Sequence, residues 1–576
     1  MTGTERPPAG DRLSPGGEPG AEVIVVGAGP VGLSLAIDLA WRGVSVVVIE
    51  ERRAGEPPSV KCNHVSARTM EAFRRLGFAG AVRNAGLPAD YPHDVAFRTS
   101  TTGVEFGRIP IPSRRDRFTC TDGPDTGWPT PEPPHRINQI YLEPVIFDHA
   151  RTLPLVRIVN RARCVGVDQG PGGVRARVRD LEGGGESVLE ASYLVGCDGG
   201  RSRTRGWIGA SLEGTAVVQR TQSTYLRAPG LLERMQGAPA WGTFSFNPRR
   251  CGVVYAVDGI ERWLVHNYLR DDEADFTSVE RDASIRAILG VDDGFSYEVL
   301  SKEDWFGRRL VADRFRDRRV FICGDASHVW VPYAGYGMNA GIADAMDLSW
   351  LLAASLAGWG GPRLLDAYEA ERLPITEQVS HFAMNHALAL RKERLAVPPE
   401  IEDAGPAGQK IRAEWGKRSY ELNVQQYCAA GLNFGYFYDH SPIIEYDGAT
   451  APGYTMGTFC PSTVPGCRVP HVRVHGGQSL YDLLGPGYTV IRTDRDAPVE
   501  RLLTAAAARR VPLDLVDIEG PEVDRSYDRA LVLSRPDQHV AWRGDAVPDD
   551  LEGLFDKISG SAGCTGIARS TGTEDR

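Results

Sequence analysis

The sequence has no apolar run long enough to cross a membrane. A bilayer-spanning helix needs roughly 18 or more uncharged apolar residues, and the longest candidates among the 576 residues, 23–26 and 44–49, have only the length of strands. Residues 1–20 combine Pro, Gly and charges of both signs and lack the apolar core of a secretory signal. We therefore expect no membrane partner, a cytoplasmic location and a disordered N-terminal tail over residues 1–20.

The ten cysteines form neither a metal-binding nor a disulfide pattern. They are scattered, with no CxxC pair and no short metal-ligand spacing, so we expect reduced thiols and no metal site. The formal net charge of −10 gives the protein no global positive field, which argues against a nucleic-acid partner.

The composition is sufficient for several hydrophobic cores. Hydrophobic residues make up 42% of the chain and charged residues 24%, as in ordinary globular proteins. Because single cores rarely grow beyond about 300 residues, we expect two or three domains.

The first chemical signal is a glycine motif inside a strand–turn–helix–strand pattern. EVIVV, GAGPVG, LSLAIDLAWRG and VSVVVIE follow one another from residue 22, which predicts a dinucleotide-binding βαβ unit. Gly27 permits the tight turn, Gly29 lets the backbone approach a pyrophosphate, and Gly32 allows close packing of helix on strand. The helix that opens at Pro30 directs its free amides at the pyrophosphate. Glu50, at the end of the second strand, is placed to accept both ribose hydroxyls. The alternative is a glycine turn that binds no nucleotide.

A second motif, residues 324–350, follows the apolar strand RRVFICG. Its sequence, GDASHVWVPYAGYGMNAGIADAMDLSW, resembles the second FAD motif of the class A flavoprotein monooxygenases, the p-hydroxybenzoate hydroxylase family. The resemblance implies that Asp325 binds the ribityl chain of FAD. It also implies that the backbone amides of Met338 and Asn339, at a helix N-terminus, meet the pyrimidine edge of the flavin, where the reduced ring carries negative charge. The same motif places Pro332, Gly335 and Gly337 beside the cofactor.

Two weaker motifs lie between these signals. YLVGCDGGRSRTR is similar to the internal aspartate–glycine motif of the family, which implies that Asp198 contributes to FAD and NAD(P)H handling. In RINQIYLEP, Gln139 corresponds to a family glutamine near the FAD pyrophosphate and ribityl group.

The segment VKCNH departs from the family pattern. The family often has an arginine here that reaches the pyrophosphate, whereas this sequence has Lys61, a point charge without the bidentate fork of arginine. His64 is a candidate base, but we interpret it first as a structural or polar lining residue.

The resemblance predicts an α/β fold with a Rossmann-like FAD-binding domain, a β-sheet substrate domain and a C-terminal thioredoxin-like domain. Alternating runs over 156–195 and 217–269 are expected to form one second sheet. VPGCRVPH and SLYDLLGPGYTVIR look like the thioredoxin-like domain of the phenol hydroxylase and polyketide aromatic hydroxylase branches, here without CxxC. The expected domains are 21–390 for FAD, with the substrate sheet inserted at roughly 85–135 and 206–305, a helical connector at 391–455, and the thioredoxin-like domain at 456–576.

The resemblance implies an aromatic monooxygenase. NADPH or NADH acts as a transient reductant, and oxygen from O2 passes through a flavin hydroperoxide to a small aromatic substrate, phenolic or a polycyclic polyketide. Trp330, Tyr333 and Tyr336 either line the reaction side or pack against the substrate sheet. The sequence leaves open Baeyer–Villiger oxygenation of a polyketide ketone, a flavin dehydrogenase that does not activate oxygen, and a flavin-binding regulator; a halogenase is disfavoured. It is equally compatible with a monomer and a homodimer, and it identifies no catalytic side chain.

Overall fold

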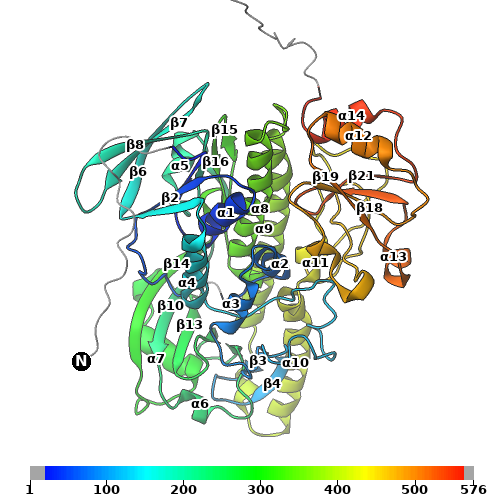
Figure 1. The fold of residues 1–576 in the computed structure, drawn as a ribbon. Helices are drawn as coiled ribbons and strands as arrows, with labels where there is room; N and C mark the ends of the chain where they lie inside the picture. Colours follow the sequence, from blue (N-terminus) through cyan, green and yellow to red (C-terminus); the bar gives the residue numbers. More distant parts are fainter. Residues whose placement is uncertain (1–19, 62, 563–576) are drawn as a thin grey trace, which may run out of the picture. The chain divides into compact units, whose positions relative to one another are not determined.

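The computed structural model describes residues 20–61 and 63–562, so most of the expected N-terminal tail lies outside the described residues. The chain divides into two compact units (Figure 1). The N-terminal unit contains the described residues up to 346, with 373–435 and 453–459, and the C-terminal unit contains 347–372, 436–452 and 460–562. This division assigns 347–372 and 436–452 to the C-terminal unit, whereas the sequence placed them in the FAD-binding domain and the connector.

The first sheet of the N-terminal unit is mostly parallel and confirms the expected βαβ unit. Val23 of β1 pairs in parallel with Val46 of β2 on one side and Tyr193 of β9 on the other. All residues of β1 and β2 are buried, as expected of parallel strands covered on both faces. The strand order is β15 (Arg316–Asp317), β16 (Val320–Ile322), β9 (Tyr193–Gly196), β1 (Val23–Val26), β2 (Val46–Glu50) and β5 (Val156–Asn160).

The second sheet of this unit has eight strands, which alternate along the chain with groups of strands from the parallel sheet. Neighbouring strands are antiparallel, except that β11 and β3 pair in parallel. Their order is β17 (His328–Trp330), β14 (Glu298–Ala312), β10 (Leu212–Arg227), β13 (Arg262–Tyr268), β12 (Gly252–Ala256), β11 (Gly242–Ser245), β3 (Val95–Arg98) and β4 (Glu105–Ile109).

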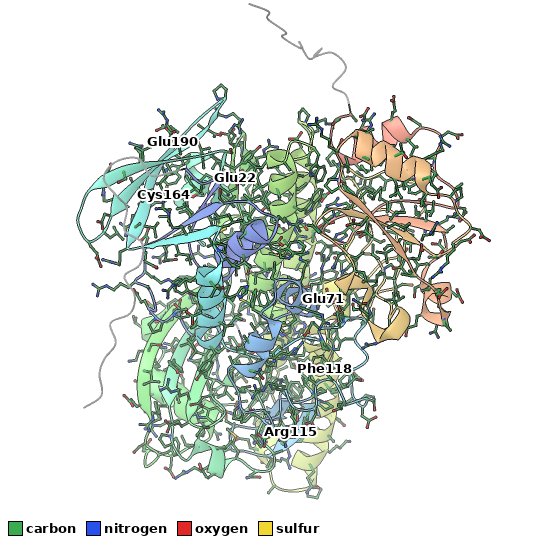
Figure 2. The ribbon with its side chains drawn as sticks, viewed as in Figure 1. Glu22, Glu71, Arg115, Phe118, Cys164 and Glu190 are labelled. Carbon is green, nitrogen blue, oxygen red and sulfur yellow. The ribbon has the colours of Figure 1, made fainter. Side chains whose placement is uncertain are left out.

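A separate three-stranded sheet corrects one expectation. The strands β6 (Ala162–Gly170), β7 (Gly173–Asp180) and β8 (Glu186–Ala191) pair only with one another, so 156–195 and 217–269 do not share a second sheet. Buried and exposed residues alternate along β7, and Figure 2 labels buried Cys164 on β6 and exposed Glu190 on β8. Alternation reveals that one face of each strand is covered, but it does not reveal the partner strand.

The helices of the N-terminal unit begin at side-chain caps where the sequence supplies them. Ser66 Oγ accepts the Thr69 amide before α2, and Asn138 Oδ1 accepts the Ile140 amide before α4. Within the described residues, none of the helices combines the length and apolarity needed to span a membrane. The helices are α1 (Pro30–Trp41), α2 (Ala67–Arg75), α3 (Ala79–Asn84), α4 (Gln139–Thr152), α5 (Arg203–Trp207), α6 (Leu231–Arg234), α7 (Arg281–Leu289), α10 (Pro406–Tyr427) and α11 (Ala430–Phe434), and α8 (Tyr336–Leu356) and α9 (Asp366–Leu395) contribute to both units.

The C-terminal unit is thioredoxin-like. Its sheet has the order β19 (Leu513–Asp517), β18 (Tyr488–Arg492), β20 (Leu531–Ser534) and β21 (Val540–Gly544), with β18 and β19 parallel and the other neighbours antiparallel. A turn joins β20 to β21, and in it Gln538 has φ +69°. The helices are α12 (Glu500–Ala508), α13 (Pro521–Ser526) and α14 (Leu551–Ile558).

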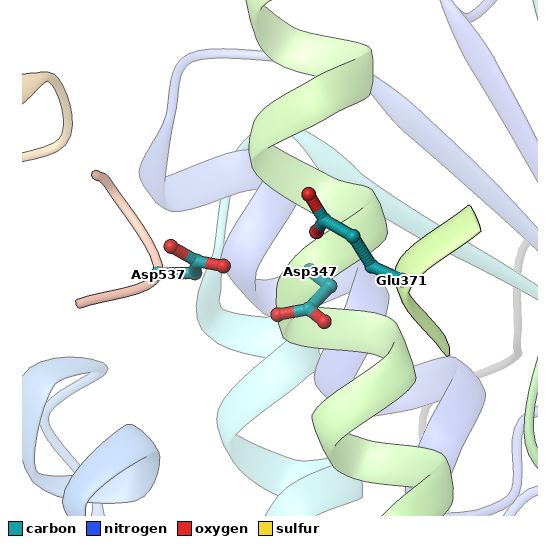
Figure 3. A group of neighbouring side chains, drawn as sticks. All are labelled: Asp347, Glu371 and Asp537. Atoms are coloured by element: carbon teal, nitrogen blue, oxygen red, sulfur yellow. The ribbon is translucent and has the colours of Figure 1, made fainter. Parts of the chain in front are cut away.

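A buried cluster of acids and arginines lies inside the C-terminal unit. Figure 3 shows the neighbouring side chains of Asp347, Glu371 and Asp537. One carboxylate oxygen of each lies within 4.8 Å of those of the other two. Arg535 binds both Glu371 oxygens at 2.6 and 2.7 Å and Asp537 at 2.7 Å, and Arg372 lies 3.4 Å from Asp347. Because guanidinium groups meet these carboxylates, we interpret the cluster as an ion-pair network.

Candidate cofactor and substrate site

The structure explains the presence of glycine differently at the three motif positions. A Cβ on Gly27, where φ is +105°, would lie 2.4 Å from the Cys197 carbonyl oxygen, and a Cβ on Gly32 would lie 2.0 Å from that of Gly27. Packing of the protein on itself therefore requires both glycines. A Cβ on Gly29 would meet nothing within 4 Å, and its backbone has the ordinary φ of −75°. Gly29 leaves space for a ligand at the N-terminus of α1.

Glu50 braces this glycine loop from the end of β2. Its carboxylate accepts the backbone amide of Ala28 at 2.7 Å and that of Arg52 at 2.8 Å. Arg52, which the sequence did not single out, also lies 2.6 Å from Glu143 of α4 and donates to the Ala28 carbonyl. Arg52 Nε also donates to Glu50 Oε1 at 3.2 Å. A carboxylate offers about four acceptor positions, so these bonds leave Glu50 about one position for a ribose hydroxyl.

The loop that carries Asp325 packs closely on the start of α8. A Cβ on Gly341 would lie 2.8 Å from the Gly324 Cα. The Asp325 side chain is accessible to solvent, yet the surrounding protein desolvates its carboxyl and raises its pKa, against the opposing effect of His328 and Lys61. Among the described residues none donates a hydrogen bond to this carboxylate, which is thus available to ligand hydroxyls.

Asn339 joins the first turn of α8 to residues 64–66. Its Oδ1 accepts the Ser66 amide at 2.8 Å, and its Nδ2 donates to the carbonyls of His64 at 3.1 Å and Gly335 at 2.6 Å. Gly335 has φ +61°, and a Cβ there would lie 2.9 Å from the His64 Cβ. Because α8 begins at Tyr336, the amides of Gly337 and Met338 lie in its first turn, where amides have no intrahelical partner. The Asn339 amide, expected from the sequence to be a second donor, is instead placed to bond within the helix to the Gly335 carbonyl. Pro332, just upstream, is exposed.

The aspartate–glycine motif contacts the Asp325 loop through an arginine. Asp198 accepts the Ser202 hydroxyl at 2.5 Å and the Arg203 amide at 2.9 Å, and it thereby caps α5. Arg205 donates to the Ala326 carbonyl at 3.0 Å. The structure therefore gives Asp198 a local capping role beside the loop.

Gln139 and Lys61 are neighbours at the start of α4. The Gln139 amide donates to the Lys61 carbonyl at 3.1 Å, and the Gln139 side chain donates to Glu143 at 2.9 Å. The exposed Lys61 ammonium pairs with Glu303 of β14 at 2.7 Å and is close enough to lower the pKa of Asp325.

His64 is a buried, neutral imidazole. Burial and the neighbouring Arg136 hold its pKa well below the usual range, and its Nδ1 contacts the Arg136 guanidinium. Its contacts with Asn339 and Gly335 are those of a positioning residue.

The three candidate aromatic residues of the loop are all buried. The Tyr333 hydroxyl donates to Gln219 of β10 at 3.0 Å, which places Tyr333 against the eight-stranded sheet. The Tyr336 hydroxyl donates to the Leu432 carbonyl. Trp330 stacks on His328 with ring centroids 4.5 Å apart.

A polar aromatic group on the eight-stranded sheet was not identified from the sequence. Ser223 Oγ lies 2.9 Å from His266 Nδ1 and accepts the Trp305 indole N–H at 2.7 Å. Burial lowers the pKa of His266 to about 4 and raises those of Tyr255 and Tyr268 well above the usual value. The alternation of apolar and polar residues along these strands indicated that one face of the sheet is covered. Which side chains lie together on that face depends on the pairing register of strands that are distant in sequence.

Comparison with known proteins decides the family. The "FAD binding domain" family matches residues 20–383, and the "Aromatic-ring hydroxylase, C-terminal" family matches residues 462–562. This chain belongs to the FAD-dependent aromatic-ring hydroxylases. The expected class A monooxygenase family, fold class and FAD cofactor are thereby confirmed, with NAD(P)H and O2 as the co-substrates of these hydroxylases.

Several hydroxylases and related flavoenzymes match nearly the whole chain. The FAD-dependent monooxygenase apdD of Emericella nidulans is 29% identical, covering 94% of this chain and 89% of that protein. Phenol 2-monooxygenase of a Pseudomonas species is 29% identical, covering 94% and 92%. The structure of the rebeccamycin biosynthetic enzyme RebC with reduced flavin is 34% identical, with a TM-score of 0.84 and coverage of 94% and 99%.

The residues present fit FAD. Gly29 offers open space at a helix N-terminus, where a pyrophosphate is favoured by free amides and the helix dipole. Asp325 offers an accessible acceptor without a protein donor among the described residues.

Proposed function

We propose that this hydroxylase inserts oxygen into an electron-rich aromatic ring held on the eight-stranded sheet. The observation that carries the proposal is the hydrogen bond from Tyr333 to Gln219. Tyr333 belongs to the loop that leads into α8, and Gln219 belongs to β10, so the loop next to the flavin-edge amides is fixed on the aromatic face of the sheet. A ring bound against that face would lie beside the loop that is proposed to hold the flavin.

The cofactor is assigned to residues from three parts of the N-terminal unit. The Gly27–Gly32 loop with Pro30 receives the pyrophosphate, Glu50 the ribose, and Asp325 the ribityl chain. The amides of Gly337 and Met338 would meet the pyrimidine edge of the bound cofactor, where backbone dipoles stabilise negative charge. The other residues assigned to the surroundings of the cofactor are Gln139, Lys61, Pro332, Gly335 and the Asp198 motif. FAD, reduced by NAD(P)H, supplies the activation of molecular oxygen.

The protein side chains provide position and polarity for the substrate. Burial keeps Tyr255 and Tyr268 protonated, so their hydroxyls are hydrogen-bond donors at neutral pH. The low pKa of His266, about 4, keeps its imidazole neutral, and a neutral imidazole can accept a hydrogen bond from a phenol. Tyr333 is assigned to the substrate side, and Trp330 and Tyr336 to the support of the loop.

The substrate class is a phenolic or polycyclic aromatic compound. Relatives include a phenol monooxygenase and an enzyme of rebeccamycin biosynthesis, and both names agree with a sheet lined by tyrosine, tryptophan and histidine. We further propose a cytoplasmic location, where NAD(P)H is supplied, and a monomer or homodimer.

The function is tested with purified holoenzyme and a panel of phenols and polycyclic quinones. NADH and NADPH oxidation and oxygen uptake are followed with and without each compound. The proposal predicts that one ring class accelerates both rates and gains a hydroxyl group. Insertion of oxygen next to a ketone instead identifies a Baeyer–Villiger enzyme, and flavin reduction without any oxygenated product identifies a dehydrogenase.

A further inference from the structure

Three side chains on the eight-stranded sheet form a chain of hydrogen bonds that ends at His266. The indole N–H of Trp305 donates to Ser223 Oγ at 2.7 Å, and Ser223 Oγ lies 2.9 Å from His266 Nδ1. The three residues belong to β14, β10 and β13. Ser223 is buried, and its hydroxyl has no further hydrogen-bond partner in the described part of the chain.

The direction of these bonds determines where the proton of the His266 ring lies. An indole nitrogen only donates, so Ser223 Oγ accepts from Trp305, and the Ser223 hydroxyl proton needs an acceptor of its own. His266 Nδ1 is the atom placed to accept it. A proton on Nδ1 would leave the buried hydroxyl without an acceptor, which is costly. The network therefore assigns the proton of the neutral ring to Nε2.

The Nε2 atom of His266 is then a donor that the protein does not use. A neutral imidazole accepts a hydrogen bond at one nitrogen and donates from the other, and Ser223 occupies the accepting nitrogen. Nε2 has no partner among the described residues. The His266 side chain is partly accessible to solvent, although the surrounding protein desolvates the ring. Protonation of the ring would not change this role, because both nitrogens of an imidazolium donate.

The strand register relates His266 to the proposed cofactor loop. His266 lies opposite Ser223, and Ser223 lies opposite Glu303, so the three side chains share one face of the sheet. The Glu303 carboxylate binds Lys61 at 2.7 Å, and Lys61 is close enough to lower the pKa of Asp325. The unused donor therefore lies on the face of the sheet that Lys61 connects to the Asp325 loop.

We propose that Trp305 and Ser223 fix His266 in the Nε2–H form, and that this nitrogen determines specificity by donating a hydrogen bond to a carbonyl oxygen of the substrate. This inference rests on the proposed function and specifies a keto or quinone group on the aromatic substrate. A carbonyl oxygen only accepts, which matches a nitrogen that only donates. The Tyr255 ring, edge to face with His266 at a centroid distance of 5.8 Å, supplies apolar surface beside the carbonyl.

The proton position is tested on holoenzyme whose histidines carry ¹⁵N. Long-range ¹H–¹⁵N correlation spectra at neutral pH distinguish a protonated from an unprotonated ring nitrogen. The signals that disappear in His266→Gln belong to His266. The proposal predicts a protonated Nε2 and an unprotonated Nδ1, and the reverse arrangement overturns it.

The ligand is tested with ketones and hydrocarbons of the same shape. The probes are 9-fluorenone with fluorene, and 1-tetralone with tetralin. Binding to oxidised holoenzyme is measured by isothermal titration calorimetry without NAD(P)H, so that no turnover is required. The wild type is expected to bind at least one ketone about tenfold or more tightly than its hydrocarbon, because the hydrocarbon leaves the donor unpaired. The infrared carbonyl stretch of that ketone should move to lower frequency than in hexane.

The variants locate the preference. His266→Leu removes the donor and should abolish the ketone preference and the frequency shift. His266→Gln keeps an amide N–H near the position of Nε2 and should retain part of both. Trp305→Phe removes the group that orients the Ser223 hydroxyl and should weaken both. Trp415→Phe, whose indole N–H has no hydrogen-bond partner among the described residues, is the matched control and should behave as the wild type. Near-ultraviolet dichroism and FAD content establish that each variant is folded.

The outcomes separate this inference from the proposed function. Equal binding of ketone and hydrocarbon by the wild type, or binding of no ketone, overturns the inference. Retention of the full preference by folded His266→Leu also overturns it. A clear ketone preference without oxygenation of any aromatic compound would support the donor site and contradict the hydroxylase function.

Discussion

Asn339 and Ser66 are 273 positions apart in sequence and are joined by a 2.8 Å hydrogen bond from the Ser66 backbone amide to the Asn339 side chain. Both residues are buried. The bond fixes the first turn of α8, which carries the amides proposed to meet the flavin edge, to the N-cap of α2. The Asn339 side-chain amide therefore contributes to holding these two segments together.

Replacement of Asn339 by leucine should weaken FAD binding. The change leaves the buried Ser66 amide and the His64 and Gly335 carbonyls without their Asn339 partner, and an unsatisfied buried group costs about 1–3 kcal/mol. We expect the Kd for FAD, measured by fluorescence titration, to rise about 10- to 100-fold. Asn84→Ala, at an exposed position, is the control. Unchanged affinity in Asn339→Leu would contradict this role.

Alanine at Gly29 should weaken FAD binding, whereas alanine at Gly32 should destabilise the fold. At Gly29 the new Cβ meets no protein atom within 4 Å, so the apoprotein should keep its melting temperature while FAD affinity falls at least about tenfold. At Gly32 the Cβ would lie 2.0 Å from the Gly27 carbonyl, so the fold itself should lose about 1–3 kcal/mol. Calorimetry and FAD titration measure the two effects, and equal destabilisation of both variants would be inconsistent with a ligand space at Gly29.

Asp325→Asn should stabilise the apoprotein while it weakens FAD binding. Burial raises the pKa of Asp325 in the folded state, so its contribution to stability is fully present below the unfolded pKa, near 3.8, and is lost as pH rises through the folded pKa. The melting temperature of the variant minus that of the wild type should therefore increase from pH 4 to pH 8. A difference that stays constant or decreases would show that Asp325 is not desolvated.

The acidic cluster of the C-terminal unit should make stability depend on pH. Burial raises the pKa of Asp347 to about 7, against the effect of Arg372. Its stabilising contribution should be lost as pH rises from about 4 to about 7, and Asp347→Asn should remove this dependence in urea unfolding at pH 5 and pH 8.

The contrasting variant in this cluster is Asp537→Asn. Burial alone would raise the pKa of Asp537, but Arg535 and His539 lower it below the usual value. Asp537→Asn should therefore be destabilised at both pH values, because Arg535 loses one of its two carboxylate partners. If Asp347→Asn and Asp537→Asn have the same pH profile, the assignment of the titrating group is wrong.

Local signals allowed the first βαβ unit to be predicted. The turn at Gly27, the helix from Pro30 and the strand ending at Glu50 are adjacent in sequence, and their glycine spacing reflects contacts within one βαβ unit. The hairpin between β20 and β21 was predictable for the same reason.

The substrate face could not be predicted, because it depends on long-range pairing. Alternation in β7 indicated a half-covered strand, but not that its partners are β6 and β8.

The central claim is that oxygen from O2 is transferred to an aromatic ring. The most direct measurement is turnover under ¹⁸O₂ with NADPH or NADH and an accepted aromatic compound, followed by mass spectrometry of the product. The account predicts one labelled oxygen atom on a ring carbon of the product. Consumption of NAD(P)H with all label recovered in hydrogen peroxide or water, across the whole substrate panel, would contradict it.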